Sequence, residues 1–242
     1  MNQEQNDQLI LIAGQSTMGK TASLRNIRNQ SKWMYFGTEA GKRIPFKNSF
    51  DAYRIADPMQ VLEGFDYAIA TPEIEGIIID SLTFLMEMFE SQYVLTAANK
   101  QTAWGDYQQF FKTIMQDKVI RFERPVIVIA HTLDVYDETT LSMKTSVPVK
   151  GALKGVGIES YFSTVVGAKR MSTKELAAYA NPHLKITPQE ASLEFKYVFQ
   201  TLPTKKTTGE RIRSPMGMFT PEETFIDNCA QMLLDFLKEY YK

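Results

Sequence analysis

Cysteine is almost absent from this sequence of 242 residues, in which Cys229 is the single example. One cysteine excludes an intramolecular disulfide framework and fits a reducing compartment. Long apolar runs are also lacking, so no segment approaches the length of a membrane span. The polar and acidic residues 1–7 lack the basic and apolar regions of a signal peptide. We therefore expect a cytoplasmic protein with a disordered tail over residues 1–7 and no membrane partner.

An excess of charge of either sign is missing as well, because 27 lysines and arginines face 28 aspartates and glutamates, for a net charge of −1. Whole-chain charge therefore gives no argument for a nucleic-acid partner, and any basic surface must be local. Between residues 142 and 174, basic residues outnumber the single acid, Glu159. A local excess of this kind can follow a phosphate backbone, although most charge runs are solvated surface. The basic residues are Lys144, Lys150, Lys154, Lys169, Arg170 and Lys174.

Internal repeats, low-complexity segments and linkers are absent from the sequence. With 44% hydrophobic residues, the chain is long enough to bury one large core. We therefore expect one domain over residues 1–242, in which residues 203–242 form a C-terminal hairpin and helix.

The rest of the chain is organised around residues 9–23. An apolar run at 9–13 predicts a buried strand, and residues 22–29 predict a helix. Between them lies Gly14-x-x-x-x-Gly19-Lys20-Thr21, the P-loop pattern in the strand-to-helix context that gives it meaning. The alternative is a glycine-rich turn before an ordinary helix.

This pattern suits phosphate chemistry. Glycines let backbone N–H groups point at phosphate oxygens, and a helix N-terminus adds its positive end. Lys20 can place its charge on the β- and γ-phosphates, and the Thr21 hydroxyl can hold Mg²⁺. The expected nucleotide-binding residues are Gly14, Gln15, Ser16, Thr17, Met18, Gly19, Lys20, Thr21 and Ala22.

Three polar side chains end or follow the strands predicted over residues 32–37, 75–80 and 124–131. Glu39 is suited to act as a general base toward water; the alternative is a solvated loop residue. Asp80 suits a place in the magnesium shell of a nucleotide, or else a helix cap. His131 suits a sensor of the γ-phosphate, or else a structural histidine. Because open α/β sheets bind ligands at the carboxyl ends of their strands, we expect these residues near the P-loop.

The remaining pattern alternates between helices and strands. Helical spacing of apolar residues predicts helices over 58–71, 82–93 and 107–115, and a capping box at Thr220 to Glu223 opens a last helix whose apolar face spans 225–240. A polar loop is predicted over 97–105, and a hairpin or ordered loop over 133–149. Further strands are predicted over 50–55, 162–168 and 193–202, and a basic turn or hairpin over 203–216.

The P-loop, Glu39, the run 77–81 that ends in Asp80-Ser81, and His131 together resemble the RecA-like ATPase core. Looser matches at 104–107, 151–155 and 213–219 make the chain similar to short phage-encoded RecA-like proteins, which are ATP-binding recombinases or are associated with single-strand annealing. The resemblance implies an α/β fold with a RecA-like P-loop NTPase core. That core is a mostly parallel sheet flanked by helices, with a C-terminal β-hairpin region and a docking helix.

The resemblance also implies an activity. It implies a DNA-stimulated ATPase that uses ATP and Mg²⁺ in phage-type recombination, annealing or replication, in the host cytoplasm. Glu39, Lys20 and His131 would be its catalytic residues, and Thr21 and Asp80 its metal-site residues. His131 takes the place of the glutamine with which RecA senses the γ-phosphate.

Partners follow from the same resemblance. Residues 99–105 match the first DNA loop of RecA and residues 133–153 the second, which places Lys144, Lys150 and Lys154 near single-stranded DNA. A homo-oligomer with ATP at its subunit interfaces is implied, with a single-strand-binding or replication protein as a further partner. One basic residue of the late segment would act in trans on the ATP of a neighbouring subunit, although this segment also fits solvated surface. The candidates are Lys205, Lys206, Arg211 and Arg213.

Three other function classes stay open. A protein-partnered ATPase motor or loader predicts hydrolysis that a protein stimulates and DNA does not. A nucleotide-gated assembly module predicts tight ATP binding with negligible turnover. A small-molecule phosphotransferase is the most distant alternative, because no arginine-rich lid is evident beyond residues 205–213.

Overall fold

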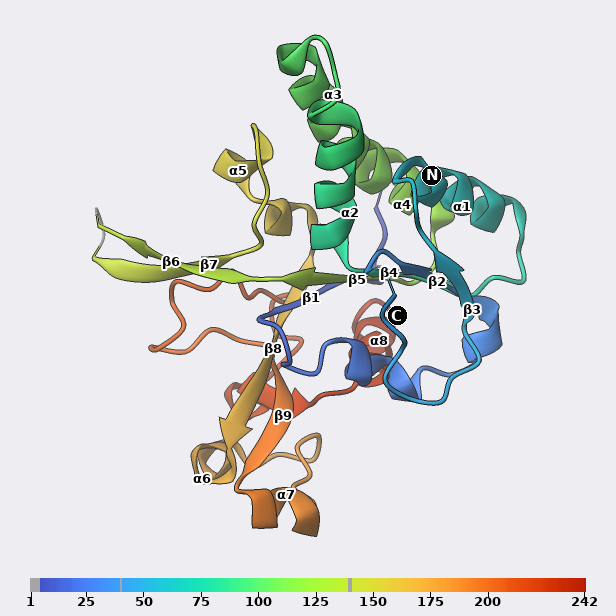
Figure 1. The fold of residues 1–242 in the computed structure, drawn as a ribbon. Helices are drawn as coiled ribbons and strands as arrows, with labels where there is room; N and C mark the ends of the chain where they lie inside the picture. The colour runs from blue at the N-terminus through green and yellow to red at the C-terminus, as the bar shows by residue number, and fades with distance from the viewer. Residues whose placement is uncertain (1–4, 40, 139–140) are drawn as a thin grey trace.

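An eight-stranded sheet forms the centre of the protein in the computed structural model, which describes residues 5–39, 41–138 and 141–242 (Figure 1). The strand order is β10-β9-β8-β1-β5-β4-β2-β3. The strands are β1 (Leu9–Gly14), β2 (Trp33–Gly37), β3 (Asp51–Arg54), β4 (Gly76–Asp80), β5 (Val126–His131), β8 (Thr164–Ser172), β9 (Phe195–Gln200) and β10 (Phe225–Asp227).

The six strands from β8 to β3 run parallel, and β9 and β10 are antiparallel additions at one edge. β1 and β4 are buried along their whole length, as expected for strands of a parallel sheet that is covered on both faces. The prediction of a mostly parallel sheet with helices around it is confirmed. An antiparallel hairpin toward the C-terminus is also present, but it consists of β8 and β9 and lies before residues 203–242, where the sequence predicted it.

Helices cover both faces of the sheet because side chains alternate along each strand. Leu9 and Leu11 point to the face covered by four helices, and Ile10 and Ile12 point to the face covered by the last helix. The four are α1 (Met59–Ala70), α2 (Leu82–Phe89), α3 (Lys100–Thr113) and α4 (Val119–Phe122), and the last is α8 (Ala230–Tyr240). Three short helices lie outside these layers: α5 (Leu153–Val156), α6 (Thr173–Leu176) and α7 (Pro188–Leu193).

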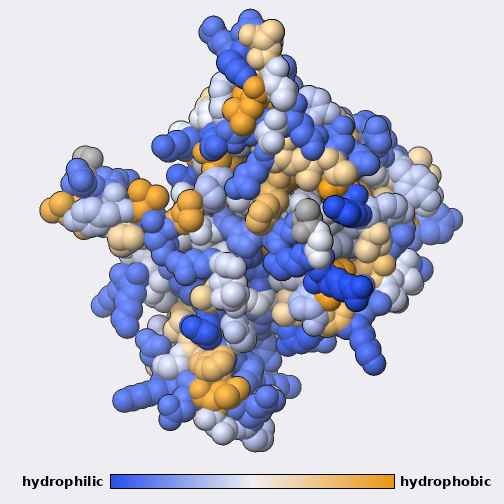
Figure 2. Space-filling model, viewed as in Figure 1, coloured by the Kyte–Doolittle hydropathy of each residue, from blue (hydrophilic) through white to orange (hydrophobic). Residues whose placement is uncertain are grey.

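A second, two-stranded sheet projects from the body of the molecule (Figure 1). It is the hairpin of β6 (Leu133–Asp137) and β7 (Ser142–Ser146), which directly follows β5. The alternation over residues 133–149 therefore predicts the hairpin correctly. Figure 2 shows apolar residues among hydrophilic ones on this projecting hairpin.

The helix predicted over 22–29 is wrong in type and length. The P-loop leads instead into a single 3₁₀ helix, Thr21–Asn26. Serine, threonine and asparagine are weak helix formers because their side chains bond to nearby backbone groups. The Ser23 hydroxyl does so here, donating to the Lys20 carbonyl at 2.6 Å, and Asn29 has left-handed backbone angles.

The polar loop predicted over 97–105 is largely helical. α3 begins at Lys100, and the Asn99 side chain caps it by accepting hydrogen bonds from the N–H groups of Gln101 and Thr102. The segment that matches the first DNA loop of RecA therefore lies on the first turns of a helix.

Three expectations for the chain ends need correction. Of the turn or hairpin predicted over 203–216, only turns are present: among the described residues this segment contains no strand, and it makes isolated bridges, one of them from Arg213 to Val165. The capping box at Thr220 caps the short 3₁₀ helix Pro221–Thr224, and the last helix begins at Ala230 after β10. Asn6 is not in a disordered tail, because its amide donates to backbone carbonyls of residues 119 and 124; residues 1–4 lie outside the described part.

Two helical glycines give opposite predictions for stability. A Cβ at Gly64 of α1 would lie 2.4 Å from the ring of the buried Phe36, whereas a Cβ at Gly105 of α3 meets nothing within 4 Å. We expect Gly64→Ala to lower the free energy of unfolding by about 1–3 kcal/mol through overpacking. Gly105→Ala should raise it by up to about 1 kcal/mol, because alanine favours helix. Urea unfolding of both variants tests this, and a stabilised Gly64→Ala would contradict the packing.

Candidate functional site

The P-loop connects β1 to the 3₁₀ helix Thr21–Asn26 at the carboxyl edge of the sheet. Two of its residues have left-handed backbone angles, with φ of 67° at Thr17 and 79° at Gly19. At Gly14 a Cβ would lie 2.6 Å from the carbonyl oxygen of Ala168 in β8. The glycines of the pattern are therefore required by a tight turn and by the close approach of a neighbouring strand.

Lys20 is folded back onto its own loop. Its side chain is buried, and Nζ donates to the carbonyl oxygens of Gly14 at 2.8 Å and Gln15 at 2.7 Å. Nζ also lies 3.4 Å from Nδ1 of His131. Burial lowers the pKa of the Lys20 ammonium to about 8, against the attraction of nearby carboxylates. The ammonium is held beside the loop by groups that a phosphate can replace.

Asp80 ends β4 with one oxygen occupied and one free. Its Oδ2 accepts hydrogen bonds from the Thr21 hydroxyl at 2.6 Å and from the Tyr35 hydroxyl at 2.7 Å. Its Oδ1 is buried and has no hydrogen-bond partner among the described residues. Burial raises the pKa of the Asp80 carboxyl above its usual range, and the bonds from Thr21 and Tyr35 oppose that rise.

An unpartnered carboxylate oxygen next to a threonine hydroxyl is an oxygen donor set of the kind that Mg²⁺ prefers. Asp80 and Thr21 therefore fit a magnesium ion that is also bound by nucleotide phosphates. Within residues 5–39, 41–138 and 141–242, no group of three or more His, Cys, Asp or Glu side chains is arranged to hold a metal. Phosphate oxygens and water would have to supply the remaining ligands.

Glu39 and His131 come together across the sheet edge. Glu39 Oε1 lies 3.1 Å from Nε2 of His131, and the Glu39 carboxylate also pairs with Lys42. Burial on its own would raise the pKa of Glu39, but the hydrogen bonds from Lys42 and His131 hold it below its usual value. Since the Lys20 ammonium only donates, Nδ1 of His131 accepts, and Nε2 carries the proton that Glu39 accepts. Glu39, His131 and Lys20 thus form one hydrogen-bonded chain.

The supporting residues were not predicted from the sequence. Tyr35 reaches Asp80 from β2, and Thr38 binds the backbone of Ser81 through its hydroxyl, which donates to the carbonyl at 2.7 Å and accepts from the N–H at 2.8 Å. The His131 ring packs edge-on against Phe84. A signal for Tyr35 exists only once β2 is known to pair with β4, because its hydroxyl lies one strand away from Asp80.

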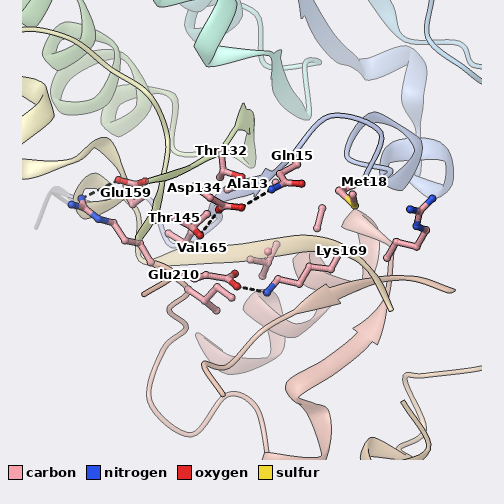
Figure 3. Close-up of a pocket in the computed structure, with 17 residues that line it drawn as sticks. Ala13, Gln15, Met18, Thr132, Asp134, Thr145, Glu159, Val165, Lys169 and Glu210 are labelled. Atoms are coloured by element: carbon pink, nitrogen blue, oxygen red, sulfur yellow. Dashed lines mark hydrogen bonds and ion pairs between the residues drawn. The ribbon is translucent and has the colours of Figure 1, made fainter. Parts of the chain in front are cut away.

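A cavity of about 250 Å³ lies beside the P-loop, between β1, β8 and the base of the hairpin (Figure 3). On its wall, the Gln15 amide donates to Asp134 Oδ2 at 2.7 Å, and the Thr145 hydroxyl donates to Asp134 Oδ1 at 2.6 Å. Asp134 therefore connects the P-loop to both strands of the hairpin. The pair of Lys169 and Glu210, 2.5 Å apart, closes another side of the cavity.

The late basic residues do not share one environment. Arg211 is bound within its own chain, to the carboxylate of the buried Glu159 at 3.2 Å and to a backbone carbonyl. Lys206 lies 3.7 Å from Glu175. Lys205 and Arg213 are exposed. None of these contacts is to the P-loop, although the Arg211 side chain also lines the cavity beside it.

The lysines expected near DNA lie away from the P-loop. Lys144 pairs with Asp137 within the hairpin, and Lys150 pairs with Glu90 of the π-helical turn after α2 at 2.8 Å. Lys150 and Lys154 line a groove of about 510 Å³ between α2 and the hairpin, which Glu90 also lines. The structure brings Lys150 and Lys154 to one groove and leaves Lys144 outside its lining.

No helix within the described part of the chain is both long and apolar enough to cross a bilayer. A search among curated proteins finds no match to the sequence. The family model described as an AAA domain matches residues 6–208, a range that contains the P-loop, Glu39, Asp80 and His131. The chain therefore belongs to the AAA domain family of P-loop, nucleotide-binding ATPases.

Proposed function

We propose that this protein is a RecA-like hydrolase of Mg-ATP. One observation carries the proposal: the buried Lys20 and Asp80 lie with the partly buried Thr21 at the carboxyl edge of the sheet, and Asp80 Oδ1 has no partner there among the described residues. Thr21 and Asp80 would hold a magnesium ion there, and the ion would shield the charge of the nucleotide phosphates. The choice of ATP among nucleotides rests on the resemblance to RecA.

The chain's own residues supply the other steps. The Lys20 ammonium leaves the loop carbonyls and binds the β- and γ-phosphate oxygens. Glu39 accepts a proton from the water that attacks the γ-phosphorus, while the bond to the β,γ-bridging oxygen breaks and ADP leaves. The lowered pKa of Glu39 keeps its carboxylate charged, which suits this role. His131 orients the carboxylate by donating a hydrogen bond from Nε2.

We further propose that hydrolysis is coupled to single-stranded DNA in phage-type recombination, annealing or replication. Lys154 in the groove beside α2 supports this, and so does Lys150 once phosphate replaces Glu90 as its partner. The active form would be a cytoplasmic homo-oligomer with ATP between subunits. The exposed Lys205 and Arg213 are the best placed of the late basic residues to act in trans, because no ion pair within the chain is found for either among the described residues.

A second candidate is a protein-partnered motor or loader. It is favoured by the hairpin, which exposes Tyr136 and Met143 and which Asp134 ties to the P-loop. A partner that moves the hairpin would then act on the loop that binds phosphate. A nucleotide-gated module with little turnover differs from both candidates in one measurable quantity, the rate of hydrolysis.

Glu39→Gln tests the assignment of the general base. The amide cannot accept the proton, so we expect turnover to fall by about 10²–10⁴-fold while Mg-ATP affinity is kept. Steady-state phosphate release and equilibrium binding measure the two effects. Glu75→Gln is the matched control, because Glu75 is paired with Lys32 outside the site at 2.8 Å and should leave turnover unchanged. Unchanged turnover in Glu39→Gln would remove Glu39 from the mechanism.

ATP affinity should depend on pH through Lys20. Its pKa is about 8 without nucleotide, and phosphate charge raises this pKa in the complex. Binding is therefore strongest below pH 8, where Lys20 is already charged, and weakens by up to about tenfold per pH unit above it. Titrations between about pH 7 and pH 9.5 measure the effect. Lys42→Ala, which retains Lys20, should keep the dependence, and a flat profile would contradict a direct contact of Lys20 with phosphate.

DNA coupling is tested by hydrolysis with and without a single-stranded oligonucleotide at two salt concentrations. We expect stimulation that fades with salt. Lys150→Ala with Lys154→Ala should weaken DNA binding and lower the salt slope by about 1.4, because each phosphate contact contributes about 0.7 on single strands. Lys47→Ala with Lys185→Ala, two exposed lysines outside the groove, is the control. Absent stimulation with ATP still bound would favour the protein-partnered candidate.

A further inference from the structure

The hairpin of β6 and β7 carries an unusual amount of exposed apolar surface. Its described residues, 133–138 and 141–146, are called the arm here. Five large apolar side chains of the arm are between 52% and 74% exposed. Figure 2 shows apolar residues on the part of the molecule where Figure 1 places the arm. The five are Leu133, Val135, Tyr136, Leu141 and Met143.

Both faces of the arm are apolar. Tyr136 lies opposite Met143 on one face, and Leu133 and Val135 lie on the other, because side chains alternate along a strand. A two-stranded ribbon cannot cover both of its faces by packing on one body, and a lone hairpin is marginally stable in water. Contiguous exposed apolar surface of this kind marks a site of contact with another molecule.

Charge argues that the arm contacts protein. The described part of the arm contains Asp134, Asp137 and Glu138 but only one cation, Lys144, and that cation is paired with Asp137. A surface that follows a phosphate backbone needs an excess of free cations. Charge therefore argues against a nucleic-acid partner, and the exposed apolar side chains of the arm favour an apolar protein groove.

The chain has such a groove on another side. A cavity of about 570 Å³ lies between α1, the end of α2 and α3, with Asp106 as the one charged residue in its described lining. Its exposed polar lining includes Thr102 and Gln109. An apolar floor with a polar rim is the usual anatomy of a protein interface. The apolar and aromatic side chains of the lining include Met59, Leu62, Phe89, Tyr93, Ala103 and Phe110.

The arm cannot reach the groove of its own chain. The groove of about 510 Å³, on the side of α2 that faces the arm, is lined by Glu87 and Glu90. The groove of about 570 Å³, on the side that faces α1, is lined by Phe89 and Tyr93. Figure 1 accordingly shows the arm and α1 on opposite sides of α2 and α3. An element on one side and a complementary groove on the other can only meet between two copies.

We propose that the arm of one copy docks into the α1–α3 groove of a second copy, so that copies assemble head to tail. This inference rests on the proposed homo-oligomer and names the two surfaces that form it. A contact between two different surfaces is heterologous, and it produces a ring or an open filament according to the rotation between copies. The base of each arm is bound through Asp134 to Gln15 of the P-loop, so each contact adjoins a nucleotide site.

Two surface variants and their mixture test the assembly. The arm variant carries Tyr136→Ser with Met143→Ser, and the groove variant carries Thr102→Glu with Gln109→Glu, all at exposed positions. Sedimentation of the wild type, with and without Mg-ATP, should show multimers, and each variant alone should be monomeric. An equimolar mixture should form a heterodimer and nothing larger, because one intact arm meets one intact groove. Tyr67→Ser with Leu193→Ser, equally exposed apolar residues outside the arm, should still assemble.

A crosslink gives a second measurement of the same contact. In a Cys229→Ser background, Met143→Cys copies mixed with Thr102→Cys copies should form mixed disulfides, and either alone should form few. Three results would overturn the proposal: a wild type that stays monomeric, a groove variant that still dimerises through its arm, or an arm variant that assembles normally but loses single-stranded DNA binding. Mg-ATP binding is measured on the wild type and on both monomeric variants, to separate this proposal from the proposed ATPase function. A wild type that assembles but does not bind Mg-ATP would contradict the ATPase function alone. Variants that bind Mg-ATP but do not assemble would support both proposals.

Discussion

The site depends on the hydrogen bonds that hold the buried carboxylate of Asp80. One of its oxygens accepts hydroxyl donors from two different elements, Thr21 after the P-loop and Tyr35 in β2, and the other has no partner among the described residues. A buried carboxylate with an unsatisfied oxygen is costly unless a cation completes it. The fold can hold it because β4 lies between β5 and β2, where both hydroxyls converge. A cation bound at the free oxygen would offset this cost.

Glu39, His131 and Lys20 form one hydrogen-bonded chain that a phosphate could interrupt. The Lys20 ammonium binds loop carbonyls and lies 3.4 Å from Nδ1 of His131. Phosphate oxygens compete for the same ammonium, and its departure leaves Nδ1 of His131 without a donor. The His131 ring can then turn toward another donor, such as a water molecule, and that movement alters the bond from Nε2 to Glu39. His131 thus connects the Lys20 ammonium, for which phosphate competes, to the Glu39 carboxylate that we propose as the general base.

Local pattern predicts the parts of this site that sit at strand ends. Buried apolar runs define β1, β4 and β5, and parallel pairing then brings Asp80 and His131 to one edge with the P-loop. Contacts made between distant elements escape such reasoning. Tyr35 bonds to Asp80 and Asp134 bonds to Gln15, and both contacts join residues that are far apart in the sequence. The helix after the P-loop is shorter than predicted because the residues near Ser23 are weak helix formers.

The arm illustrates the limit most clearly. Its alternation of apolar and polar residues is typical of a strand with one buried face, and it does predict the hairpin. The same alternation cannot tell whether the covering surface belongs to this chain, and in the described part of the chain five large apolar side chains of the arm stay more than half exposed. Apolar side chains that no part of their own molecule covers are stabilised when another molecule binds over them. Because Asp134 joins the arm to Gln15, whatever covers the arm also bears on the loop that holds phosphate.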